Sequence, residues 1–157
     1  MIHIVTGKIN SGKTTRLTDL YQNNHAGDGF VSVKRMHYNK VHGYDLMRLS
    51  DQSTHRFVIH QDYYNDIDPI DCQIGPYLFY ADVVGYVEDQ VNTWIEQDVS
   101  PIYLDEIGML ELHDKCFASA LKQCIHSGVE TYITVRHDLV DDVINTFQIK
   151  DVNILLD

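Results

Sequence analysis

The pattern of apolar and polar positions in the first part of the chain predicts a strand, a helix and three further strands. The run Ile2–Val5 is β-prone and ends at a glycine-containing segment, as a buried strand does before a turn. Leu17, Leu20 and Tyr21 then recur at helical spacing and predict a helix over residues 14–24. Three β-prone segments follow in close succession, at residues 29–36, 42–49 and 56–61, with polar turns at 39–40 and 50–53. Their short spacing predicts an antiparallel meander.

The rest of the chain alternates between helical and extended patterns. A polar stretch that contains Pro69 and Pro76 predicts a long loop over residues 63–76. Apolar positions at helical spacing predict helices over residues 82–97 and 113–127, and a shorter helix over 138–147. Strands are predicted at residues 101–104, 129–135 and 153–156. We therefore expect one α/β domain over residues 1–157, with a mainly parallel sheet, flanking helices and an antiparallel extension at one edge.

The segment between the first strand and the first helix carries candidate chemistry. Its sequence, TGKINSGKTT at residues 6–15, contains the pattern G-x-x-x-x-G-K-[ST], which binds phosphate when a strand precedes it and a helix follows. Glycines at positions 7 and 12 let the main chain approach phosphate oxygens, and the helix N-terminus adds unpaired N–H groups. The Lys13 ammonium is then placed for the β- and γ-phosphates, and the Thr14 hydroxyl for Mg²⁺. The predicted nucleotide-binding residues are Gly7, Lys8, Ile9, Asn10, Ser11, Gly12, Lys13, Thr14 and Thr15.

Two adjacent acids at the end of a later strand supply a second candidate feature. Residues 101–108, PIYLDEIG, form an apolar run that ends at Asp105 and Glu106. The carboxyl ends of parallel strands meet at the edge where the loop lies, so Asp105 is expected to hold Mg²⁺ together with Thr14. Glu106 is expected to accept a proton from the water that attacks the γ-phosphorus. This requires the strand to end there, because neighbouring residues of a strand face opposite ways. Two solvated charges that simply end the strand are the alternative.

The charge balance restricts the partners of such a site. Lys and Arg total 12 against 23 Asp and Glu, a formal net charge of −11, which argues against a general binder of nucleic acid or of anionic membranes. An acidic chain that binds a polyanion has to gather its cations locally, as Lys8, Lys13 and Arg16 do at the loop. A second cationic group consists of Lys34, Arg35 and Lys40. No apolar run approaches the roughly 20 residues of a membrane-spanning helix, and no signal-peptide pattern begins the chain.

Histidine and cysteine spacing indicates no further metal site. The nine histidines match no zinc-binding pattern. His37 and His42, like His55 and His60, are expected on opposite faces of predicted strands because their spacing is odd. The three cysteines, Cys72, Cys116 and Cys124, show no C-x-x-C spacing, so reduced thiols and a cytoplasmic location are expected.

Four segments of the chain carry a resemblance to a known family. They are GKINSGKTT, GFVSVKRMHYNKVHGYDL, IGPYLFYADVVGYVED and YLDEIGMLELHDKCFASAL, in this order over nearly the whole chain. They are similar to the small P-loop nucleoside-triphosphatase family that includes THEP-type enzymes and the cancer-related nucleoside-triphosphatase, and DEIGMLEL at residues 105–112 is the most specific piece. The resemblance implies a P-loop NTPase fold and Mg²⁺-dependent hydrolysis of several nucleoside triphosphates.

The roles that the resemblance implies fall on Lys13, Thr14, Asp105 and Glu106, with Glu106 as the base. Residues 9–11, INS, depart from the family, which has a Pro-Gly-hydrophobic run there. Glu111 matches a family acid, and we expect it to have a structural role after the strand.

Two other functions share these motifs. A small-molecule or nucleotide kinase would use the same loop and metal-binding acid but transfer the γ-phosphate to a hydroxyl, with acceptor contacts from residues 37–44 and 63–71. A nucleotide switch would report the γ-phosphate to a protein partner, and the sequence shows no heptad repeat that identifies one. Arg136, at the end of a predicted strand, is either a γ-phosphate contact or an ordinary surface residue. The guanine-reading N-K-x-D pattern is absent, and no base preference is predicted.

Overall fold

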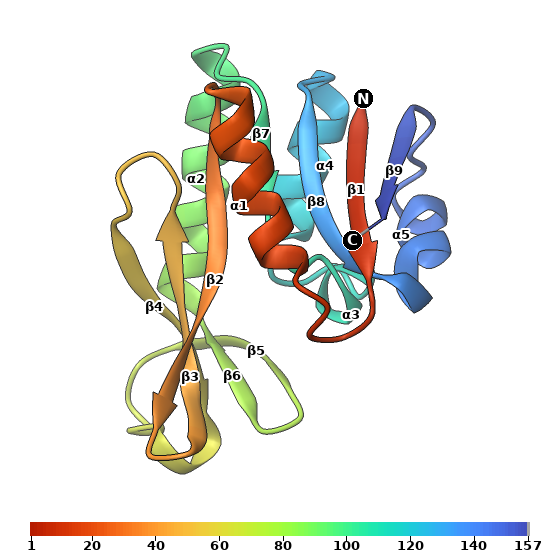
Figure 1. Ribbon diagram of the computed structural model, residues 1–157. Coiled ribbons are helices and arrows are strands. Elements are labelled where there is room, and N and C mark those ends of the chain that lie inside the picture. Colours follow the sequence, from red (N-terminus) through yellow and green to blue (C-terminus); the bar gives the residue numbers. More distant parts are fainter. Residues whose placement is uncertain (157) are drawn as a thin grey trace.

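In the computed structural model, which describes residues 1–156, nine strands form one mixed sheet (Figure 1). The strands follow the order β5-β6-β4-β3-β2-β7-β8-β1-β9 across the sheet. Their bounds are β1 Ile2–Gly7, β2 Asp28–His37, β3 Lys40–Arg48, β4 Thr54–His60, β5 Ile70–Ile74, β6 Tyr77–Tyr80, β7 Ile102–Leu104, β8 Thr131–Arg136 and β9 Val152–Leu156. The α-helices are α1 Lys13–Asn24, α2 Ala81–Glu96, α3 Met109–Leu112, α4 Ala118–Ser127 and α5 Val140–Thr146. Short 3-10 turns cover Gln61–Tyr63 and His137–Leu139.

One half of the sheet is parallel. Strands β2, β7, β8, β1 and β9 run in the same direction, and helices lie on the connections between them. Ile102, Tyr103 and Leu104 of β7 are completely buried because both faces of this half are covered. The carboxyl ends of these strands meet at one edge, where β1 enters the glycine-containing loop.

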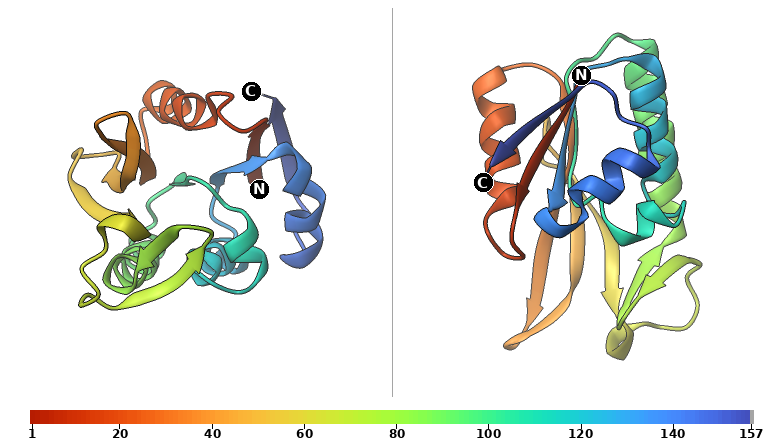
Figure 2. Two further views of the ribbon diagram at one scale, coloured as in Figure 1. Left: turned by 90° about the horizontal axis from the view of Figure 1, so that it is seen from below. Right: turned by 90° about the vertical axis from the view of Figure 1, so that its right-hand side faces the viewer.

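Helices cover both faces of the parallel half. α1 packs on one face, where Leu17 belongs to a cluster with Val5 and Tyr103. α2 and α4 pack on the other face and contribute Trp94 and Leu121 to the larger core cluster. Figure 2 shows α1 on one side of the sheet and α2 and α4 on the other. The predicted α/β fold with flanking helices is confirmed. None of the helices in residues 1–156 has the length and apolar character needed to cross a membrane.

The antiparallel half is larger than the sequence predicted. β2, β3 and β4 form the expected meander, and β6 and β5 continue it. The predicted long loop over residues 63–76 is therefore wrong for residues 70–74, which form β5. Ile70, Cys72 and Ile74 alternate with polar residues there, but Pro69 and Pro76 at either end favoured a loop. Pairing with the apolar strand β6 supplies the hydrogen-bonded ladder that makes this segment a strand.

The antiparallel strands project beyond the parallel ones at the edge where the loop lies. β2 has 10 residues whereas its parallel neighbour β7 has 3, so β2 continues past the end of β7. Figure 1 shows β3, β5 and β6 extending below the loop that joins β1 to α1. We call β3, β4, β5, β6 and the second half of β2 the extension.

The helix predicted over residues 113–127 begins later than expected. The chain first forms the short helix α3, and α4 begins only at Ala118. Asp114 and Cys116 between them adopt left-handed φ angles of 60° and 56°, which an α-helix cannot contain. The Phe117 N–H donates to the Glu111 carboxylate at 3.1 Å instead of to a helical carbonyl. A side-chain acceptor six residues away thus sets the start of α4, and periodicity alone does not reveal it.

The prediction that His37 and His42 point apart is wrong. Their rings lie 5.9 Å apart, centroid to centroid. The two residues lie on β2 and β3, the two strands of one hairpin. The rule for odd spacing applies only within a strand, so it does not hold across the turn.

Candidate functional site

The loop after β1 and the acids after β7 line one polar cavity at the carboxyl edge of the sheet. The cavity has a volume of about 130 Å³. From the loop and the first turn of α1 it is lined by Asn10, Ser11, Gly12, Lys13, Thr14 and Thr15. From the ends of β7 and β8 it is lined by Asp105, Glu106 and Thr134. The structure thus brings the two predicted motifs together, and we call this space the phosphate cavity.

The first three residues of the predicted loop lie outside the lining of this cavity. Gly7 is the last residue of β1 and pairs with Arg136 of β8. The Lys8 carbonyl accepts a hydrogen bond from the Lys13 ammonium at 2.6 Å. The side chain of Ile9 is exposed. This part of the loop therefore acts on the site through its backbone.

Gly12 has the backbone conformation that the motif requires of a glycine. It is the N-cap of α1 with φ 96°, in the left-handed region. It has no side chain to cap the helix, and the first turn contains no acid, so the first N–H groups of α1 are available to an anion. Asn10 also has a left-handed φ, 59°, which asparagine adopts more readily than most residues. Gly7 has no positive φ, so the freedom expected of it is not used there.

Asp105 is a buried carboxylate held only by uncharged donors. It is 1% exposed. It accepts hydrogen bonds from the Thr14 hydroxyl at 2.7 Å, the Thr134 hydroxyl at 2.6 Å and the Ser32 N–H at 3.1 Å. Burial raises the pKa of Asp105, and these hydrogen bonds act in the opposite direction. Within residues 1–156 no cation pairs with this carboxylate, so the site favours a bound positive ion.

The oxygen atoms around Asp105 fit Mg²⁺. A threonine hydroxyl and a carboxylate are hard oxygen ligands, and Mg²⁺ usually combines one or two carboxylates with substrate phosphates and water. Across the part of the chain that the structure describes, no group of three or more His, Cys, Asp or Glu side chains could hold a metal ion. A metal at Thr14 and Asp105 would therefore depend on nucleotide oxygens for the rest of its ligands.

Glu106 reaches the same cavity because the strand ends before it. β7 stops at Leu104, and Glu106 has a left-handed φ of 61°, a costly conformation for this residue type. Its N–H donates to the Thr134 hydroxyl at 2.6 Å, and the next N–H, of Ile107, donates to the Thr134 carbonyl at 2.9 Å. These bonds to β8 hold the chain in the turn that carries Glu106.

The surroundings of Glu106 suit a group that accepts a proton near neutral pH. Burial among the atoms of the site is the largest cause that raises its pKa to about 7, and the negative charges of Asp105 and Glu111 act in the same direction. Lys13 and Lys34 lower the pKa by smaller amounts. Protein atoms surround much of the carboxylate, but part of the side chain still reaches solvent, so the carboxylate is accessible from the cavity that it lines.

The sequence did not identify Thr134 as a functional residue. Its hydroxyl donates to Asp105 and accepts from the Glu106 N–H, so one side chain holds both acids. Thr134 is 0% exposed, and the available signal was a polar residue near the carboxyl end of an apolar strand.

Lys34 and Tyr44 on the extension lie near enough to Glu106 to interact with it electrostatically. The two residues pair across β2 and β3. The charge of Lys34 lowers the pKa of Glu106. Burial is the largest cause that raises the pKa of Tyr44, and electrostatic interactions with Tyr77 and then with Glu106 raise it further. The site therefore extends from the loop to the extension, which the sequence did not show.

Glu111 has the structural role expected of it. Arg136 and Arg35, the two arginines considered from the sequence, instead form ion pairs with other residues. The buried Glu111 carboxylate accepts hydrogen bonds from the N–H groups of Gly108 at 2.8 Å and Phe117 at 3.1 Å, and so holds the chain after β7. The Arg136 guanidinium pairs with Asp138 at 2.5 Å. Arg35 pairs with Asp45 at 3.0 Å.

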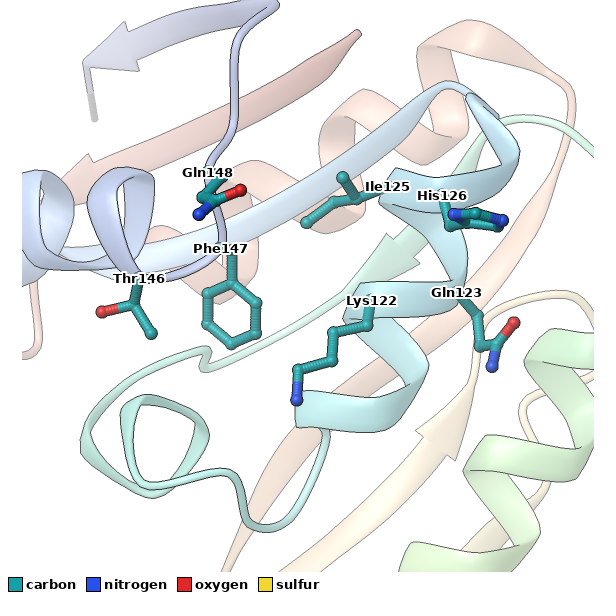
Figure 3. A pocket seen from close by; sticks show the side chains of 7 residues that line it. All are labelled: Lys122, Gln123, Ile125, His126, Thr146, Phe147 and Gln148. Atoms are coloured by element: carbon teal, nitrogen blue, oxygen red, sulfur yellow. The ribbon is translucent and has the colours of Figure 1, made fainter.

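A larger cavity elsewhere contains none of the predicted site residues. It has a volume of about 430 Å³ and lies between α4 and the residues at the end of α5 (Figure 3). Lys122 and His126 of α4 and Phe147 contribute to its lining. Lys122 pairs with Asp114, so its charge is already matched. The glycine loop and the paired acids identify the smaller phosphate cavity as the candidate site.

The comparisons with known proteins agree with this assignment. The fold is similar to the crystal structure of THEP1 from the hyperthermophile Aquifex aeolicus, with a TM-score of 0.69 and 16% sequence identity. The similarity covers 99% of this chain and 89% of that one, and it shows that the chain has a P-loop NTPase fold. No curated protein matches the chain in sequence. The sequence model of the NTPase family matches residues 2–156. The chain therefore belongs to this NTPase family, which supports nucleoside triphosphate hydrolysis as its general activity.

Proposed function

We propose that this protein hydrolyses nucleoside 5′-triphosphates to the diphosphate and phosphate in a Mg²⁺-dependent reaction. The observation that carries the proposal is the single cavity lined by both the glycine loop and the pair Asp105 and Glu106. The direct hydrogen bond from Thr14 to Asp105 joins the two motifs at the place where a metal ion would bind. Membership of the NTPase family supports the same reaction class.

Binding of the triphosphate falls to the loop and α1. The free N–H groups at the start of α1 and the Lys13 ammonium bind the β- and γ-phosphate oxygens. The Lys13 ammonium has three N–H donors, so it can keep its hydrogen bond to the Lys8 carbonyl while it donates to the phosphate oxygens. Thr14 and Asp105 would hold Mg²⁺, which when bound supplies positive charge to the phosphate oxygens.

Cleavage falls to Glu106. Its carboxylate orients a water molecule and accepts its proton as the water oxygen bonds to the γ-phosphorus. The bond between the γ-phosphorus and the β,γ-bridging oxygen breaks, and the nucleoside diphosphate leaves with that oxygen. The Thr134 hydroxyl accepts a hydrogen bond from the backbone N–H of Glu106 and so positions that residue. Thr134 takes no part in the proton transfer.

The test separates turnover from binding. Glu106→Gln should lower kcat by about 10²- to 10⁴-fold, the usual contribution of proton transfer, with nearly unchanged nucleotide affinity. Lys13→Ala should lower kcat and also weaken nucleotide binding. Glu96→Gln, an exposed acid at the end of α2, is the matched control and should change neither. An unchanged kcat in Glu106→Gln would remove Glu106 from the mechanism, and intact affinity in Lys13→Ala would contradict the role of the loop.

Phosphate release without an added acceptor distinguishes hydrolysis from the kinase alternative. Steady release of phosphate from nucleoside triphosphate and Mg²⁺ alone is expected for a hydrolase. A kinase would show none until a hydroxyl acceptor is supplied. A nucleotide switch would release about one equivalent and then stop.

A further inference from the structure

A second cavity adjoins the phosphate cavity across the two acids. It has a volume of about 140 Å³, and Asp105 and Glu106 line both cavities. Its other walls are mostly apolar and come from two parts of the chain, the extension and the segment after β7. The apolar side chains among them are Phe57, Ile74, Phe79, Met109, Leu110 and Phe117. We call this space the apolar chamber.

The inner wall of the apolar chamber consists of closely packed aromatic rings. Phe57 stacks on Phe117 with ring centroids 5.2 Å apart and planes at 2°, and it meets Phe79 edge to face at 5.3 Å. Phe57 and Phe117 are buried. The Glu111 carboxylate fixes the segment after β7 through its bonds to the backbone of Gly108 and Phe117. The chamber is therefore formed before any ligand arrives.

The outer wall of the apolar chamber leaves two large apolar side chains in solvent. Ile74 of β5 is 42% exposed and Met109 of α3 is 40% exposed. Burying apolar surface is favourable, so a ligand that covers both side chains gains affinity from them. The two residues come from different parts of the chain and meet at one cavity, which distinguishes them from scattered surface residues.

Charge and size limit what the chamber can accept. Among the described residues, its lining contains three carboxylates and no lysine, arginine or histidine. A phosphorylated or carboxylated ligand would meet like charges without a counter-ion. One water molecule occupies about 30 Å³ of the liquid, so the chamber holds the volume of about five waters. That suits one six-membered ring with a short substituent and is too small for a nucleoside.

We propose that the apolar chamber binds the ring of a small uncharged alcohol, whose hydroxyl lies at Glu106 and accepts the γ-phosphoryl group in place of water. The proposal rests on the proposed function, because it needs a nucleoside triphosphate in the phosphate cavity. The residues that the sequence suggested for an acceptor, 37–44 and 63–71, do not line the chamber. The acceptor site instead combines Ile74 and the phenylalanines of the extension with Met109.

The transfer balances without any further reactant. The alcohol oxygen bonds to the γ-phosphorus, and its proton passes to the Glu106 carboxylate. The bond from the γ-phosphorus to the β,γ-bridging oxygen breaks, which releases the nucleoside diphosphate. The products are the diphosphate, the phosphate monoester of the alcohol and one proton.

Benzyl alcohol is a suitable probe because it has one ring, one hydroxyl and no charge. We expect it, titrated into the millimolar range, to shift the methyl resonance of Met109 in protein labelled with ¹³C-methyl methionine, with no shift at Met36 or Met47. Glycerol, which has hydroxyls but no ring, should not shift it. With γ-³³P-labelled nucleoside triphosphate and Mg²⁺, benzyl alcohol should divert label from phosphate to benzyl phosphate.

A substitution at the mouth of the chamber provides the matched test. Ile74→Trp places a large ring at the rim, and it should abolish both the Met109 shift by benzyl alcohol and the formation of benzyl phosphate. Hydrolysis without alcohol should continue, because Ile74 does not line the phosphate cavity. Ile154→Trp is the control: Ile154 is also 42% exposed but lies on β9, at the opposite end of the sheet order, and should change nothing.

Each outcome decides one part of the proposal. A Met109 resonance that does not respond to benzyl alcohol would overturn the binding site. A response without labelled benzyl phosphate would overturn the transfer to an alcohol. Phosphate release in the absence of alcohol tests the proposed hydrolysis separately, so its failure is not confused with failure of the chamber.

Discussion

Replacing Thr134 with valine should destabilise the protein and slow hydrolysis through one lost hydroxyl. Valine has nearly the same shape as threonine, so the change removes hydrogen bonds without opening a cavity. The lost donor serves the Asp105 carboxylate at 2.6 Å, in a buried position. The lost acceptor serves the Glu106 N–H, also at 2.6 Å, in a part-buried position.

The expected cost follows from these two bonds. A hydrogen bond to a charged group contributes about 1.5–3 kcal/mol, and a buried donor without a partner costs about 1–3 kcal/mol. Because water can reach the part-buried N–H of Glu106, leaving this donor without its partner costs only about 1 kcal/mol, the lower end of that range. We expect Thr134→Val to lower the free energy of unfolding by about 2.5–4 kcal/mol. Thr134→Ser keeps the hydroxyl and loses one methyl group, which costs about 1 kcal/mol.

Urea denaturation measures the stability, and phosphate release measures the catalytic effect. Since Thr134 positions Glu106, kcat should fall up to about 10²-fold in Thr134→Val and recover in Thr134→Ser. Thr131→Val is the control on the same strand, because its buried hydroxyl donates to the Val129 carbonyl and touches neither acid. It should cost about 1 kcal/mol and leave kcat unchanged. Equal stability of Thr134→Val and the wild type, or equal loss of kcat in Thr131→Val, would refute the bridging role.

Three further predictions concern the metal and the acids. Thr14→Val should raise the Mg²⁺ concentration for half-maximal hydrolysis by about 10- to 100-fold, measured by Mg²⁺ titration, and an unchanged requirement would contradict the proposed ligand. In metal-free protein, the free energy of unfolding should fall as the pH rises from about 4.5 to about 7, because folded Glu106 keeps a proton that the unfolded chain releases. Glu106→Gln should reduce that slope in urea titrations, and an equal slope would disprove the shift. Lys34→Ala should raise the pKa of Glu106 further, seen by carboxyl ¹³C NMR, whereas Lys40→Ala at the hairpin turn should not.

The sequence was sufficient for the parts of the site that are local. The loop residues are contiguous, and the strand before them and the helix after them supply the context, so Lys13 and Thr14 could be placed from the motif. The position of Asp105 and Glu106 at the same edge followed from the parallel arrangement of strands. The structure has both motifs in one cavity, as that reasoning required.

The sequence was insufficient where a role depends on strand register or on an unusual backbone angle. Thr134 reaches Asp105 only because β7 and β8 pair so that Leu104 lies beside Ile133. The left-handed φ of Glu106 runs against the preference of glutamate, and hydrogen bonds to Thr134 of β8 hold the chain in this turn. The apolar chamber escaped prediction because Ile74 lies in a segment whose prolines and polar residues predicted a loop.

The length of β7 determines which face of the sheet each of the two acids, Asp105 and Glu106, lies on. Tyr103 belongs to the cluster on the α1 face, and the alternation of a strand places Asp105 on the same face, where Thr14 meets it. Leu104 belongs to the cluster on the opposite face, and Glu106 follows it toward the apolar chamber. Because the strand ends at Leu104, the turn at Glu106 keeps its carboxylate in the phosphate cavity as well. Asp105 therefore meets Thr14 while Glu106 lies between the phosphate cavity and the apolar chamber, so in the reactions proposed above the extension would decide whether water or an alcohol meets the γ-phosphate.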